Sequence, residues 1–91
     1  MKLEELYKVI QKRMEEKKDG SYVAKLVSGG TDRVIQKIGE EAIEVVIAAK
    51  NSGKDRLISE SADLLFHLLI LLSVRQITLA DIEKELMARK K

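Results

Sequence analysis

The chain has 91 residues and 45% of them are hydrophobic, which is more apolar surface than one core of this size easily hides. We therefore expect one domain spanning residues 1–91 that associates with another copy. The sequence has no Cys, which excludes disulfides, thiolate metal sites and a Cys nucleophile. Its net charge of +2, with both signs interspersed and only three aromatic residues, disfavours a nucleic-acid-binding protein.

The first residues, MKLEELYKVI, form an amphipathic pattern that carries acids, which is typical neither of a signal peptide nor of a transit peptide. The longest apolar run, residues 64–72, is interrupted by His67 and is too short to span a bilayer. These features predict a cytoplasmic protein with neither a membrane nor a nucleic acid as its partner.

Runs with apolar residues at helical spacing are separated by polar and Gly-containing breaks. The predicted helices, in chain order, cover residues 2–18, 21–27, 31–50, 54–75 and 78–88. Ser21 is expected to cap the second helix, and Thr78 with Asp81 resembles a capping box at the start of the last. No strand-like alternation is sustained, so we expect an all-α, four- to five-helix bundle.

The third predicted helix has two apolar surfaces and one polar flank between them. Its main apolar stripe consists of Ile35, Ile38, Ala42, Val45, Val46 and Ala49, and Ile43 and Ile47 mark the second surface. The flank consists of Lys37, Glu40, Glu41, Glu44 and Ala48. Glu41 and Glu44 are three residues apart, so their carboxylates are neighbours that repel each other.

The fourth predicted helix is apolar almost all the way round, apart from one narrow stripe. Glu60, Asp63 and His67 share that stripe, while the run LLFHLLILL fills most of the remaining surface. A helix of this kind is buried on most sides, and one small chain has too few other helices to surround it. A second copy would supply the missing cover, so the pattern predicts a homodimer.

Carboxylates in an apolar helix are costly unless they are paired, neutralised or bound to a metal. Two such pairs on facing helices would concentrate negative charge, which a hard cation with oxygen ligands relieves. We therefore predict an Mg²⁺ site formed by Glu41, Glu44, Glu60 and Asp63. Two alternatives stay open: solvated surface carboxylates, and structural ion pairs with Arg33, Lys37 or Arg56.

These residues also form a recognisable motif, E-E-x-x-E followed after a gap of 15 residues by E-x-x-D. The flanking stretches narrow the choice of family further; they are SYVAKL (21–26), KIGEE (37–41), EVVIAAKN (44–51) and ADLLFHLL (62–69). Together they resemble the phosphoribosyl-ATP pyrophosphatase family of the MazG-like all-α nucleotide pyrophosphohydrolases, over roughly residues 3–86. Two departures are visible, since Val23 stands where the family often has Thr and Phe66 where it often has Tyr.

The resemblance implies Mg²⁺-dependent hydrolysis of phosphoribosyl-ATP to phosphoribosyl-AMP and pyrophosphate, the second step of histidine biosynthesis. It also implies a homodimer with helices of both chains around each site. The residues that it assigns to catalysis are Glu40, Glu41 and Glu44, with Glu40 placed to orient or deprotonate water. The candidates for binding substrate are Lys25, Lys37, Lys50 and Asn51.

Other interpretations remain at this stage. His67 is expected to be a neutral histidine bonded to a carboxylate or to the backbone, because Mg²⁺ prefers oxygen, and Tyr22 either stacks on the base or covers the core. A pyrophosphatase for other nucleoside triphosphates would share the metal site. A non-catalytic helical dimer would use the carboxylates as ion-pair partners. Nucleic-acid binding through the basic termini is the least favoured interpretation.

Overall fold

The computed structural model describes residues 2–51 and 53–90, and these residues form helices and no strand. The helices are α1 (Leu3–Glu16), α2 (Tyr22–Ser28), α3 (Thr31–Asn51), α4 (Lys54–Val74) and α5 (Leu79–Ala88). The predicted all-α fold is confirmed, and the predicted helix bounds differ from the observed ones by a residue or two at most.

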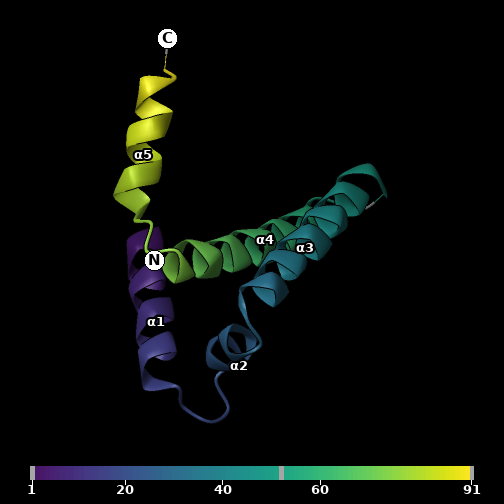
Figure 1. Ribbon diagram of the computed structural model, residues 1–91. Helices are drawn as coiled ribbons and strands as arrows, with labels where there is room; N and C mark the ends of the chain where they lie inside the picture. Colours follow the sequence, from purple (N-terminus) through teal and green to yellow (C-terminus); the bar gives the residue numbers. More distant parts are fainter. Residues whose placement is uncertain (1, 52, 91) are drawn as a thin grey trace.

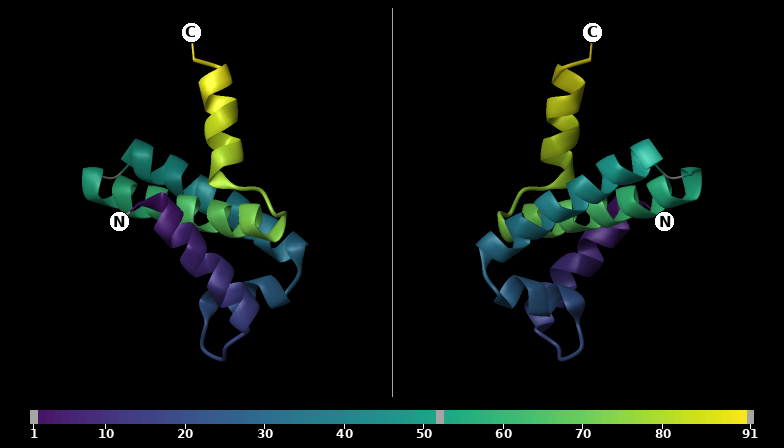
Figure 2. Two further views of the ribbon diagram at one scale, coloured as in Figure 1. Left: turned by 90° about the vertical axis from the view of Figure 1, so that its left-hand side faces the viewer. Right: turned by 90° about the vertical axis from the view of Figure 1, so that its right-hand side faces the viewer.

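Helices α3 and α4 run antiparallel, side by side (Figure 1). Helix α1 packs across α4, and the short α2 lies between the end of α1 and the start of α3. Helix α5 projects away from the other four in every view (Figure 2). The predicted site residues therefore lie on the pair of helices α3 and α4 and on α2, which precedes α3.

Local signals fix the helix ends, as the sequence predicts. The Ser21 hydroxyl accepts a hydrogen bond from the Ala24 amide at 3.2 Å, which caps α2. Thr78 and Asp81 form the predicted capping box at α5, with reciprocal hydrogen bonds of 3.1 and 2.9 Å. Gly30 has φ +98° between α2 and α3, a conformation that glycine adopts without steric cost.

The core lies where α1, α2 and the start of α3 meet the second half of α4. Its buried members are Tyr7, Ile10, Val23, Leu26, Val34, Leu69 and Ile70. The Tyr7 hydroxyl donates to the Ile77 carbonyl, which ties α1 to the turn between α4 and α5. The family departure at Val23 is therefore an apolar side chain in the core.

The buried face of α3 does not coincide with its main apolar stripe. The two buried residues of helix α3 are Val34 and Ala48, whereas Ile35, Val46 and Ala49 of the stripe are exposed. Because α3 has two apolar surfaces, its sequence alone does not say which face packs on α4. The face of α3 that packs on α4 includes Ala48 and the half-buried Glu41 and Glu44 of the predicted polar flank. Glu41 is thereby turned toward the carboxylates of α4.

Large apolar side chains stay exposed on the faces of α3 and α4 that point away from the core, and on α5. They include Ile43, Val46 and Ile47 on α3, Ile58, Leu65 and Leu68 on α4, and Ile82, Leu86 and Met87 on α5. No residue of α5 is buried. Apolar patches of this extent mark surfaces that another molecule covers.

Helix α4 is also long enough and apolar enough to cross a membrane, with a mean hydropathy of 1.8 over its most apolar 18 residues. The sequence prediction that residues 64–72 are too short for a span applies to that run alone, because the helix that contains it has 21 residues. One such helix is weak evidence for a membrane protein, since core helices of other proteins meet the same criterion.

Removing most of the Ile10 side chain tests this core. Ile10 is 1% exposed, so Ile10→Ala should lower the free energy of unfolding by about 2–5 kcal/mol, because it leaves a cavity. Denaturant unfolding at fixed protein concentration measures this loss. The neighbouring Val9→Ala, at a 47% exposed position, is the control and should cost clearly less. Equal losses in the two variants would contradict the described packing of α1.

Candidate active site

Three carboxylates meet between α3 and α4. One oxygen from each of Glu41, Glu60 and Asp63 lies within 4.8 Å of the others. Glu41 and Glu60 are half-buried and Asp63 is exposed, so the group opens to solvent on one side. These three residues, called the acidic group below, include three of the four ligands that the sequence predicts.

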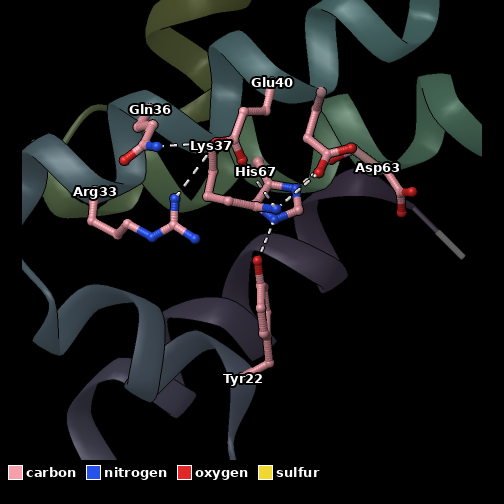
Figure 3. Close-up of polar contacts among 8 residues, drawn as sticks. Tyr22, Arg33, Gln36, Lys37, Glu40, Asp63 and His67 are labelled. Atoms are coloured by element: carbon pink, nitrogen blue, oxygen red, sulfur yellow. Dashed lines mark hydrogen bonds and ion pairs between the residues drawn. The ribbon is translucent and has the colours of Figure 1, made fainter.

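Two other carboxylates of the motif lie outside the acidic group. Glu44, one turn beyond Glu41, is half-buried but is not a member of the group that the described residues form. Glu40 is exposed and turned toward the start of α3, where it accepts a hydrogen bond from Gln36 at 3.1 Å (Figure 3). The roles predicted for both stay predictions.

Cations from one turn away partly neutralise the acidic group. The Lys37 ammonium lies 3.1 Å from Glu41, and the Arg56 guanidinium lies 3.7 Å from Glu60. The hydrogen bond to Glu41 raises the pKa of Lys37 above its usual 10.5, and burial opposes this only in part. The ion pairs considered from the sequence therefore exist, alongside the clustering that a metal site requires.

His67 is held by two hydrogen bonds that fix its tautomer (Figure 3). Its Nδ1 lies 2.7 Å from the Asp63 carbonyl oxygen, which only accepts, so Nδ1 carries the proton. Its Nε2 then accepts from the Tyr22 hydroxyl, also at 2.7 Å. His67 is buried and bonded to the backbone, as the sequence predicts, and both of its ring nitrogens have a hydrogen-bond partner.

Tyr22 reaches from α2 onto α4, where His67 and Phe66 hold it. Its ring stacks beside Phe66 with centroids 6.4 Å apart and meets the edge of His67 at 5.6 Å. Even so, Tyr22 is about half exposed. Tyr22 therefore covers part of the core while leaving an aromatic surface beside the acidic group.

A cavity of about 460 Å³ opens between α2 and α3. This basic cavity is lined by Tyr22, Lys25, Leu26, Gly29, Arg33 and Lys37. It brings together the two lysines that the resemblance favours, Lys25 and Lys37. Lys50 and Asn51 lie elsewhere, exposed at the other end of α3. Arg33, which the sequence analysis names only as an ion-pair partner, also lines this cavity.

Comparison with known proteins identifies the family. A family model described as phosphoribosyl-ATP pyrophosphohydrolase matches residues 3–90. This chain belongs to that family. The family predicted from the sequence is confirmed, and with it a hydrolase of histidine biosynthesis.

Similar proteins named phosphoribosyl-ATP pyrophosphatase occur in archaea and bacteria. That of Metallosphaera sedula is 46% identical over 98% of this chain and 96% of its own length. That of Saccharolobus solfataricus is 44% identical over 98% and 95% of the two chains. That of Pelotomaculum thermopropionicum is 48% identical over 97% and 90%. The matches therefore cover the whole acidic group and the basic cavity.

The ion pair between Lys37 and Glu41 has a consequence for pH. Because the pKa of Lys37 is raised, the pair stabilises the fold below pH 10.5 and loses this effect as pH rises through the raised pKa. Glu41→Gln should return the pKa of Lys37 toward 10.5, as measured by NMR titration of the lysine side chain in EDTA. Glu40→Gln is the control and should move it less, because Glu40 is the weakest of the causes that raise it. An unchanged pKa in Glu41→Gln would contradict the described contact.

Proposed function

We propose that this protein hydrolyses phosphoribosyl-ATP to phosphoribosyl-AMP and pyrophosphate, and that the acidic group holds the Mg²⁺ that the reaction needs. The metal assignment rests on one observation: three carboxylate oxygens, from two helices, lie within 4.8 Å of one another. The substrate assignment is supported by relatives named phosphoribosyl-ATP pyrophosphatase at 44–48% identity over nearly the full chain.

The donor atoms of the acidic group fit Mg²⁺. All three are carboxylate oxygens, which hard cations prefer, and neither nitrogen of His67 is available as a soft alternative. Exposure of Asp63 leaves room for the waters and phosphate oxygens that complete an octahedron. Glu44, one turn along α3 from Glu41, remains the proposed fourth ligand. Mg²⁺ bound there would neutralise phosphate oxygens and lower the pKa of a coordinated water.

The chain's own residues then supply positive charge and orientation. Lys37 contacts Glu41 now, and its ammonium is within reach of a phosphate bound at the acidic group. Phosphoryl transfer depends chiefly on such charge and positioning. Glu40, which lies outside the acidic group, is the proposed residue that orients or deprotonates the attacking water. Lys50 and Asn51 remain proposed substrate contacts at the far end of α3.

Loss of one carboxylate of the acidic group should abolish turnover. We expect pyrophosphate release from phosphoribosyl-ATP to require Mg²⁺, to stop in EDTA, and to fall on the order of a hundredfold or more in Glu60→Gln and Asp63→Asn. Circular dichroism should show both variants folded. Asp55→Asn, which removes an exposed acid from the first turn of the same helix, should keep its activity. Full activity in EDTA would overturn the metal assignment.

A substrate panel separates the proposal from its nearest alternative. Release from phosphoribosyl-ATP, without comparable release from ATP or deoxynucleoside triphosphates, supports the proposed substrate. Release only from the other triphosphates would keep the metal site and replace the substrate.

We also propose that the active protein is a homodimer. The large apolar side chains that α3 and α4 leave exposed support this, because a second copy would cover them. A second copy of the chain would cover the exposed apolar side chains of α4, so no membrane is needed to explain them. Charges of both signs, with few aromatic residues, do not favour a nucleic acid. A cytoplasmic location agrees with these partners.

A charge on this apolar surface should break the dimer. Leu65 is 38% exposed in the single chain, and Leu65→Lys should shift the protein from dimer to monomer in sedimentation experiments, because a desolvated lysine is costly at an interface. Lys12→Glu on the exposed side of α1 should stay dimeric. If the unmodified protein sediments as a monomer at micromolar concentration, the proposed dimer is wrong.

A further inference from the structure

We propose that the basic cavity between α2 and α3 binds the phosphate of the ribosyl group that the substrate carries on its adenine base. This phosphate is absent from ATP, so the cavity would set the preference for phosphoribosyl-ATP. The inference rests on the proposed function for the identity of the substrate, and on the cavity itself for the rest.

The residues that line the cavity carry only positive charges, and the one carboxylate that pairs with two of them, Glu40, is not among them; it lies 3.8 Å from Arg33 and 3.7 Å from Lys37. Lys25 comes from α2, Arg33 and Lys37 come from α3, and no carboxylate is among the lining residues. Arg33 has one ion pair, with Glu40, at 3.8 Å between half-exposed side chains, which is a weak contact. Within residues 2–51 and 53–90, Lys25 has no ion pair. Three cations that converge on one hollow fit a dianion such as a phosphate monoester.

The cavity also lies in line with the acidic group. Arg33, Lys37 and Glu41 are four residues apart on α3, so Arg33 stands about 12 Å from Glu41 along the helix axis. Figure 3 shows Arg33, Lys37 and Asp63 in this order along the helix pair. Lys37 belongs to both places, since it lines the cavity and contacts Glu41.

The substrate has a matching order of groups. Its triphosphate and its ribosyl phosphate are two anionic ends, with the adenosine between them. With the triphosphate at the acidic group, the other end extends along α3 toward α2. The half-exposed ring of Tyr22, held by His67, forms a wall of the same cavity and offers an aromatic surface beside the base.

The preference for phosphoribosyl-ATP over ATP would follow from the positive charge that the cavity leaves without a partner when ATP is bound. A site built to pair with a substrate group rejects an analogue that lacks it, because its own charged groups are then left without a partner. The triphosphate tail has Mg²⁺ and Lys37 within reach at the acidic group. Lys25 and Arg33, further away, are the cations that remain for the second phosphate.

Binding of the two products without turnover tests this assignment. Phosphoribosyl-AMP carries the ribosyl phosphate, AMP lacks it, and pyrophosphate represents the tail. In calorimetric titrations, with EDTA present for the two nucleotides and Mg²⁺ present for pyrophosphate, phosphoribosyl-AMP should bind more tightly than AMP. Arg33→Ala and Lys25→Ala should each weaken the binding of phosphoribosyl-AMP by roughly tenfold to a hundredfold. Neither variant should change the affinity for AMP or for pyrophosphate. Lys12→Ala, on the exposed side of α1, should change none of the three.

Two outcomes would overturn the inference. Weaker pyrophosphate binding with an unchanged preference for phosphoribosyl-AMP would assign the cavity to the triphosphate tail. Unchanged binding of all three in both variants would show that the cavity holds no phosphate. Because the two nucleotide titrations need neither metal nor turnover, they stay decisive if the proposed Mg²⁺ site is wrong. In turnover experiments, Arg33→Ala should raise KM for phosphoribosyl-ATP with little change in kcat, which a general loss of folding would not produce.

Discussion

Repulsion between Glu41 on α3 and Glu60 and Asp63 on α4 is the constraint around which this structure is arranged. Their oxygens lie within 4.8 Å, and like charges this close are costly unless cations compensate them. Lys37 and Arg56 compensate two of them in the structure, each from one turn away on the same helix. The close antiparallel packing of α3 and α4 maintains the arrangement. A site that gathers more negative charge than its neighbours neutralise is prepared for a cation.

The helix α2 links this acidic group to the basic cavity. Tyr22 crosses to α4 and donates to His67, whose other nitrogen is bonded to the backbone at Asp63. The same short helix carries Lys25 to the cavity beside Arg33. One small element therefore contributes to the core through Val23, to the acidic side through Tyr22, and to the basic side through Lys25. This explains how a short chain brings opposite charges into adjacent sites.

Much of this could be predicted from the sequence, because the deciding signals are local. Breaks and caps fixed the helices, and the polar stripe of α4 brought Glu60 and Asp63 to one face. The packed face of α3 could not be predicted, because it depends on which of two apolar surfaces meets α4. The role of Glu44 as a fourth ligand stays a prediction, because the three oxygens that meet belong to Glu41, Glu60 and Asp63. The cavity that Arg33 lines could not be predicted either, because it exists only after α2 folds against α3.

The most direct test of the central claim is to locate a bound divalent cation without any nucleotide. Mn²⁺, which takes the same oxygen ligands as Mg²⁺, broadens NMR signals of nearby residues in the isotope-labelled protein. Broadening should centre on Glu41, Glu60 and Asp63, should be reversed by excess Mg²⁺ and should be lost in Glu60→Gln. Broadening centred elsewhere, or unchanged in Glu60→Gln, would contradict the claim that these carboxylates form the metal site.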